Sequence, residues 1–276
     1  MRRRVAVLLL AAGCQPTPTT TPAPAVAPAT VSRDVELPDA QLVLAQAVEA
    51  AGGAAAHEAL HSYYLESRMD LPQQGLRGDT KLWWKDGKFH LEVVMQGVGP
   101  SSIWYDGTAV VAEDPFSGRR TLAGKEARQA RWATSISLAH DWAEYFATAR
   151  TIARHEQDGR SFLDVVLAAD DGSELLLRFD ATTHLLASQR FSQVSPMGEL
   201  PVEIVVLEYR PLGALQHAVR TKTITSVVTA DNEVIKFEPN VDIDDAQFAL
   251  PTAPAAPASD PPPSPAPPRA PAKRPG

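Results

Sequence analysis

The stretch LRGDTKLWWKDGKFHLEVVM, residues 76–95, decides the fold because its apolar side chains recur at every second position. Leu82 and Trp84 fall on one side of an extended chain, with their neighbours on the other. This period of two is typical of a strand with one apolar face. The Asp86-Gly87 pair in the middle suits a tight hairpin turn, where both central residues take a positive φ. The stretch therefore predicts two antiparallel strands joined by a hairpin.

Three more Asp-Gly pairs, at 106–107, 158–159 and 171–172, lie between runs of the same kind. Each pair predicts another hairpin, and successive hairpins form an antiparallel meander. Later strands are expected from residue 151 onward and near residues 160–168, 173–179, 185–194, 203–209, 218–228 and 233–238.

Helical patterns interrupt the strands in two places. Asp39 is positioned to cap a helix that Gly52 and Gly53 end, and a short second helix follows to about Leu60. A longer helical stretch, from about Lys125 to Ala149, carries an apolar stripe at helical spacing. The fold class is therefore α+β, mainly antiparallel β, with a curved sheet covered by helices on one side.

The N-terminus has the layout of an export signal. Three arginines at positions 2–4 precede an apolar run at 5–12 that is too short to span a bilayer as a permanent helix. The sequence LAAGC at 10–14 resembles the lipobox of bacterial lipoproteins, which implies that Cys14 is acylated and begins the mature chain. The alternatives are an ordinary signal peptide or a buried thiol. Gln15 after the cysteine favours, by analogy, the outer membrane.

The composition of the sequence divides the chain into four regions. Residues 1–13 are expected to be the lipoprotein signal peptide. Residues 14–36 and 252–276 are rich in Pro and Ala, with few bulky apolar side chains to offset chain entropy. We expect a tether after the acylated cysteine and a disordered tail at the C-terminus. Residues 37–251 contain no repeat or second linker and are expected to form one domain.

Charge and motif content exclude several classes of function. With a net charge of −7, the protein has no long-range attraction to the negatively charged phosphate backbone of nucleic acids. No nucleic-acid partner is therefore expected. A single cysteine allows neither an internal disulfide nor a multi-cysteine zinc site. No phosphate-binding loop, dinucleotide-binding glycine motif or nucleophile elbow occurs. Aspartate pairs at 170–171 and 244–245 fall in predicted turns. No catalytic residue and no cofactor is expected.

One motif nevertheless points to an enzyme. The sequence HEALH, residues 57–61, matches H-E-x-x-H, in which His57 and His61 would bind zinc and Glu58 would act as general base. The predicted helix has only about two turns before a strand begins at Ser62, and no third ligand has a recognisable spacing. A zinc metallopeptidase remains the less favoured alternative, and no metal ligand is assigned.

Several turn motifs follow one another in an order that resembles a known superfamily. They are GG…AL (Gly52, Gly53, Ala59, Leu60), WYDG (104–107), FDATTHLL (179–186), EYRPLG (208–213) and IDDAQFALP (243–251). This order resembles the LolA/LolB-like superfamily, especially its outer-membrane lipoprotein-sorting proteins, over about residues 40–251. The resemblance implies a strongly bent antiparallel half-barrel whose concave face, covered by helices, receives acyl chains.

Apolar positions of the alternating strands would then line the hollow. An acyl chain that enters it gains roughly 0.8 kcal/mol for each methylene removed from water, without any catalytic group. The alternative is that the same side chains form an ordinary packed core. The candidate ligand-binding residues are Leu82, Trp84, Phe89, Leu91 and Val93, with Leu175, Leu177 and Phe179 from later strands.

These expectations describe a periplasmic lipoprotein that is anchored through lipidated Cys14 to a membrane of the bacterial envelope, with the outer membrane favoured. Its expected ligand is an acyl lipid or a lipoprotein, which it carries or receives without catalysis. The alternative function is a scaffold lipoprotein that keeps the fold without a ligand and uses its rim for protein contacts.

Overall fold

A computed structural model of the chain describes residues 36–195 and 198–251. Its thirteen strands form one antiparallel sheet in the order β6-β5-β4-β3-β2-β1-β13-β12-β11-β10-β9-β8-β7. The sheet consists of two meanders, and β1 joins them by pairing with β13 from the far end of the domain. The strands are β1 (Ser62–Leu71), β2 (Leu76–Lys85), β3 (Lys88–Met95), β4 (Gly99–Tyr105), β5 (Val110–Asp114), β6 (Gly118–Leu122), β7 (Thr148–Gln157), β8 (Arg160–Ala168), β9 (Glu174–Asp180), β10 (Leu186–Ser195), β11 (Gly198–Leu212), β12 (Leu215–Thr225) and β13 (Thr229–Pro239).

Residues 76–95 form the predicted hairpin of β2 and β3. Leu82 lies opposite Leu91 across the pair, so both apolar side chains point to the same face of the sheet. The turn places Asp86 at φ 47° and Gly87 at φ 82°, as a turn with two positive φ values requires. The fold class is therefore as predicted: a mainly antiparallel sheet that remains open between its edge strands β6 and β7.

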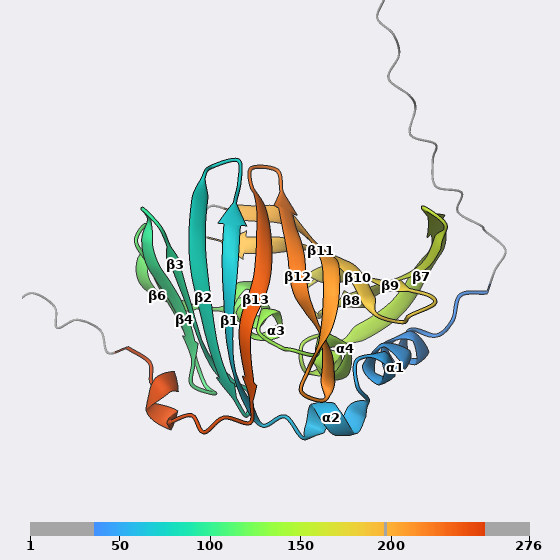
Figure 1. The fold of residues 1–276 in the computed structure, drawn as a ribbon, viewed down its shortest axis with the longest axis horizontal. Coiled ribbons are helices and arrows are strands. Elements are labelled where there is room, and N and C mark those ends of the chain that lie inside the picture. Colours follow the sequence, from blue (N-terminus) through green and yellow to red (C-terminus); the bar gives the residue numbers. More distant parts are fainter. Residues whose placement is uncertain (1–35, 196–197, 252–276) are drawn as a thin grey trace, which may run out of the picture.

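Helices cover one face of this sheet, which we call the inner face. Figure 1 shows the sheet bent around α3, with α1 and α4 near its β7–β9 end. The Asp39 carboxylate caps α1 by accepting a 2.8 Å hydrogen bond from the backbone N–H of Gln41. The helices are α1 (Ala40–Ala50), α2 (Ala54–Glu58), α3 (Gly124–Ala133) and α4 (Leu138–Asp141), with short 3-10 turns η1 (Trp142–Glu144) and η2 (Asp245–Phe248).

The single helix expected from about Lys125 to Ala149 is wrong, because the chain leaves helical geometry after Ala133. The Thr134 hydroxyl bonds back to the carbonyl of Arg131 at 2.9 Å, which competes with continuation of the helix. β7 then begins at Thr148. The apolar stripe of this region therefore belongs to two short helices and the segment between them.

The inner face carries the hydrophobic core in separate clusters. One cluster packs α1 and Trp132 against β8 and β9, where Val165 and Leu167 are completely buried. Another gathers around Tyr63, Leu82 and Phe89 on β1–β3. The alternation in the sequence therefore places its apolar side chains beneath the helices at both ends of the sheet.

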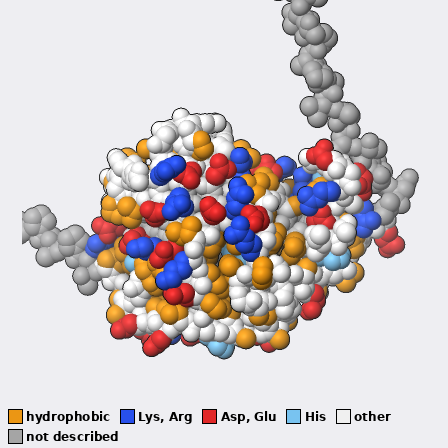
Figure 2. Space-filling model, viewed as in Figure 1, with side chains coloured by type: hydrophobic (Ala, Val, Ile, Leu, Met, Phe, Trp, Pro, Cys, Tyr) orange, Lys and Arg blue, Asp and Glu red, His pale blue; other side chains and the backbone are white. Residues whose placement is uncertain are grey.

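The opposite, outer face carries a row of stacked rings. Trp83 packs against Tyr64 on β1 and against His90 on β3, and His90 stacks on Trp104 of β4 with centroids 4.8 Å apart. Gln247 of η2 shares a 2.9 Å hydrogen bond with His90 Nδ1. Figure 2 shows basic and acidic side chains interleaved over the front of the molecule, without a broad region of one sign.

Several expectations lie outside the described residues. They are the signal peptide at 1–13, acylation of Cys14, the tether up to residue 35 and the tail at 252–276. Within the described ranges, no helix combines the length and the apolar character that crossing a membrane demands.

The turn that follows α1 packs closely against the turn between β11 and β12, which makes Gly52→Ala a test of the fold. Gly52 has φ +126°, and a Cβ there would lie 2.5 Å from the carbonyl oxygen of Ala214. We expect the substitution to lower the free energy of unfolding by more than about 2 kcal/mol in urea denaturation. Gly118→Ala, which shares a positive φ but has open space around it, is the control and should cost about 1 kcal/mol. Equal losses would contradict this close packing.

Candidate functional site

Residues 134–137, which we call the central segment, cross the inner face between α3 and α4. The Tyr63 hydroxyl donates a 2.6 Å hydrogen bond to the Thr134 carbonyl, and both residues are buried. Ser135 Oγ donates to Asp141 at 2.8 Å, which ties the segment to α4. Ser137 Oγ lies 3.4 Å from His57 Nε2, which ties it to α2. The central segment is therefore held over the middle of the sheet from three sides.

A cavity of about 370 Å³, the β3 cavity, lies on the α3 side of the central segment. Its size falls within the range of small-molecule pockets. Phe89 and Leu91 of β3 form part of its floor, while Ala130 of α3 forms part of its roof. Charged side chains, including the Arg120–Glu126 pair at 2.6 Å, occur in its wall. The β3 cavity is an apolar space with an ionic border.

A second cavity of about 190 Å³, the β9 cavity, lies on the other side of the central segment. Leu177 and Phe179 of β9 contribute apolar surface, and Ala47 of α1 and Ala51, just after that helix, close it from the helical side. Ile136 of the central segment also lines it. Two cavities thus remain beneath the helices where the sequence suggested one hollow.

A third hollow of about 430 Å³ opens beside α2 and α4 and is more polar. His57 stacks on His140 with ring centroids 5.4 Å apart. Burial lowers the pKa of His57, and the neighbouring His140 lowers it further. The Arg131 guanidinium lies over the rings of Tyr105 and Tyr145, at 4.9 and 5.5 Å from their centroids. This hollow borders the central segment, and it shares Ser135 and Ser137 with the wall of the β9 cavity.

The predicted ligand-binding residues all lie in the strands where they were expected, but they do not form one site. Phe89 and Leu91 line the β3 cavity, and Leu177 and Phe179 line the β9 cavity. Trp84 lines the hollow beside α2. Leu82, Val93 and Leu175 line none of these three spaces; Leu82 and Leu175 pack into the core clusters.

Other lining residues escaped the sequence analysis. Ile103 and Ala112 sit in β4 and β5, whose sequences GPSSIWY and VVAED show no regular alternation of apolar and polar residues. Ala130 follows no pattern that separates a cavity wall from a packed helix face. Gln189 and His217 line the β9 cavity although they are polar. Alternation of apolar and polar residues does not identify such side chains, and no other sequence signal indicates them.

The structure does not arrange HEALH as a zinc site. α2 ends at Glu58, and His61 lies just before β1 and is exposed. His57 instead faces Ser137 and His140. In the part of the chain that the structure describes, no group of three or more His, Cys, Asp and Glu side chains is arranged to hold a metal ion. The two histidines therefore lack the one-turn helical spacing that the motif requires.

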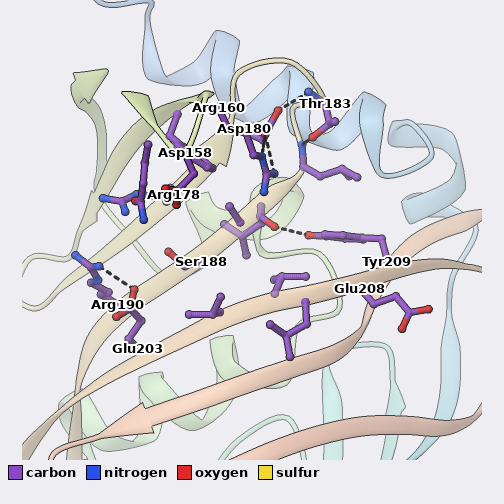
Figure 3. Close-up of a pocket in the computed structure, with 18 residues that line it drawn as sticks. Asp158, Arg160, Arg178, Asp180, Thr183, Ser188, Arg190, Glu203, Glu208 and Tyr209 are labelled. Atoms are coloured by element: carbon purple, nitrogen blue, oxygen red, sulfur yellow. Dashed lines mark hydrogen bonds and ion pairs between the residues drawn. The ribbon is translucent and has the colours of Figure 1, made fainter. Parts of the chain in front are cut away.

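A further hollow of about 640 Å³ lies on the outer face between β8 and β11 (Figure 3). Most of its charged side chains form ion pairs. Arg160 bonds Asp180 at 2.7 Å, and Arg190 bonds Glu203 at 2.8 Å. Burial opposes ionisation of Asp180, but the backbone N–H of Thr183 and the Arg160 guanidinium lower its pKa to about 2. This arrangement favours a structural role for these charges over binding of an ion.

Comparisons with known proteins identify the fold. No protein-family model and no curated protein matches the sequence. A solved LolA superfamily protein from Nitrosomonas europaea is similar over 77% of this chain and 98% of its own, with 14% identity and a TM-score of 0.52. A DUF1329 family protein from Desulfovibrio piger is similar over 76% and 97%, with 11% identity and a TM-score of 0.52.

A third solved structure is a putative outer-membrane lipoprotein-sorting protein domain from Vibrio parahaemolyticus. It is similar over 76% of this chain and 97% of its own, with 10% identity and a TM-score of 0.48. The two structures with the higher TM-scores confirm the fold resemblance that the turn motifs predicted. The chain has a LolA-like fold.

Stability should fall in mild acid because the fold keeps several half-buried histidines neutral. Burial lowers the pKa of His217 from 6.5 to about 4, so the unfolded chain binds a proton between these pH values and the folded chain does not. This contribution is fully present above pH ~6.5 and amounts to about 2 kcal/mol of lost stability at pH ~5. Burial shifts His57, His90 and His155 in the same direction.

Urea denaturation between pH ~7 and pH ~5 measures this effect, and His217→Leu should remove part of the pH dependence. A wild-type stability that does not change over this interval would contradict the burial of these rings.

Proposed function

We propose that this chain is a non-catalytic lipoprotein that binds acyl chains in the cavities of its inner face. The observation that carries the proposal is the pair of apolar cavities under the helices, one floored by Leu91 and the other by Leu177. Chains of methylene groups gain free energy there from burial alone. The fold likeness to a LolA superfamily protein supports the same function.

The proposal includes how the protein is placed in the cell. Acylation of Cys14 would anchor the chain to a membrane, and the Pro- and Ala-rich residues 14–36 would separate the domain at 37–251 from the lipid surface. Residues 1–13 would be removed as a signal peptide. We place the anchored protein at the outer membrane, facing the periplasm, where it carries or receives an acyl lipid or a lipoprotein.

The geometry favours a carrier or receptor over an enzyme. The cavity walls are mainly apolar, and the described His, Cys, Asp and Glu side chains provide no metal site. Ser135, in the wall of the β9 cavity, uses its hydroxyl to hold the central segment to Asp141. Binding and release then depend on access to the cavities.

Filling the β3 cavity tests the proposal. Ala130→Phe places a ring in the cavity from α3, which should displace at least two methylenes of a bound chain. Losing about 1.6 kcal/mol of burial weakens the Kd by about tenfold. The dissociation constant of a neutral apolar fluorescent dye, measured on the purified full chain, reports this change.

Ala147→Phe is the control, because Ala147 is exposed and away from the cavities, and it should leave binding unchanged. Mass spectrometry of organic extracts from the wild type should recover an acyl lipid. Absence of both extractable lipid and dye binding would overturn the acyl-binding function and favour the scaffold alternative.

A further inference from the structure

The edge strand β7 has several buried polar atoms without a partner. Thr151 Oγ1, Arg154 Nε and His155 Nε2 are each buried and form no hydrogen bond. Every other helix or strand in the described part of the chain has at most one such atom. Buried polar groups in folded proteins are nearly always hydrogen-bonded, because an unpaired one has lost its water without compensation. Their concentration on β7 indicates a partner that the described residues do not supply.

The sheet is open along this same strand. β7 pairs with β8 on one side, and no strand of the described chain lies on its other side. Figure 1 shows β7 at the outer edge of the bent sheet. Its ten residues present a long row of backbone N–H and C=O groups that have no ladder to join. A further strand added at this edge would pair with these groups.

The unpartnered atoms lie on both faces of the edge. Thr151 and Arg154 face inward, because their partners in register on β8 belong to the core of the inner face. His155 lies on the outer face, where it stacks on Phe162 and only 10% of its side chain is exposed. Side chains of directly opposed strand residues lie about 5 Å apart. A strand added along β7 would therefore bring its own side chains within reach of these residues.

Two arginines of β7 carry charge without a counter-ion. Arg150 and Arg154 form no ion pair, hydrogen bond or ring contact with another residue that the structure describes. Glu156, on the same strand, pairs with neither. The opposite edge strand β6 has only five residues, and its Arg119 and Arg120 are paired with carboxylates at 2.7 and 2.6 Å. A partner that carries carboxylates is therefore complementary to β7 rather than to β6.

Charge and composition argue against two other occupants of this edge. A second copy of the chain would bring the arginines of two β7 strands close together, and like charges on opposed strands are destabilising. The C-terminal residues 252–276 are rich in proline, which cannot donate to a ladder, and contain a single acidic residue, Asp260. An acidic segment of another protein suits the edge better.

We propose that β7 is a docking edge for a separate protein, which adds an extended segment with carboxylate side chains to the sheet. The backbone of that segment forms the ladder, and its carboxylates pair with Arg154 on the inner face or Arg150 on the outer face. No residue of β7 lines the β3 cavity or the β9 cavity, so this interaction is independent of acyl binding.

Three fluorescent peptides, each as long as β7, test the docking edge by anisotropy titration with the purified full chain. In the first, glutamate alternates with threonine. The second has lysine in place of every glutamate, and the third is the first peptide with every backbone nitrogen methylated, which removes its ladder donors. We expect only the first peptide to bind. Arg154→Gln should weaken its Kd about fivefold, because a charged cross-strand pair is lost.

Arg68→Gln is the matched control, because Arg68 is an exposed arginine on β1, in the interior of the sheet, and it should leave the Kd unchanged. Hydrogen exchange locates the bound peptide: amides of β7 that point away from β8 should exchange more slowly in the complex, and amides of β6 should not change.

Four results would overturn the inference. They are failure of the first peptide to bind, equal binding of the lysine or the methylated peptide, an equal effect of Arg154→Gln and Arg68→Gln, and protection outside β7. Slow exchange of the outward amides of β7 in the free protein would also overturn it, because the chain itself or a second copy would then occupy the edge.

Discussion

The hydrogen bond between the Tyr63 hydroxyl and the Thr134 carbonyl holds the chain between α3 and α4 against the middle of the sheet. It fixes the central segment, residues 134–137, against β1, the strand that joins the two meanders of the sheet. Because the segment is pinned there, the bent sheet neither fills completely nor leaves one continuous channel. The apolar space is divided into a cavity over β3 and a smaller one over β9.

Charge is distributed around this divided interior in a consistent way. On the outer face, the arginines between β8 and β11 are matched by carboxylates, as in the Arg160–Asp180 and Arg178–Asp164 pairs. On the inner face, charge borders the β3 cavity and is missing from the β9 cavity. The acyl chain that we propose as ligand would meet apolar side chains in both cavities without leaving a charge unpaired.

Much of the fold could be predicted because short-range rules agree with the final structure. The alternation in residues 76–95 and the Asp86-Gly87 turn are local signals, and both are present in the β2–β3 hairpin of the structure. The break of the expected helix after Ala133 was not predictable, because a single threonine that bonds back to Arg131 is not a distinctive signal. The Tyr63 hydroxyl that holds the Thr134 carbonyl also comes from a strand about seventy residues away in the chain. The pairing of β1 with β13 has no local signal either.

The site was predictable only in part, for the same reason. Alternation identifies which side chains face inward, and Phe89, Leu91, Leu177 and Phe179 do line cavities. It cannot separate them from Leu82 or Leu175, which are packed in the core, because packing depends on the helix laid above each position. Gln189 and His217 interrupt the apolar pattern and are recognisable only once the cavity around them is seen.

The most direct test of the central claim is methyl NMR of the protein with an acyl ester that carries a nitroxide near the end of its chain. The account predicts that methyl signals of Leu91 or Leu177, on the inner face, lose intensity when the ester binds. Signals of Val227, exposed at the tip between β12 and β13, should be unaffected. Broadening confined to exposed methyl groups, with Leu91 and Leu177 unchanged, would contradict the account.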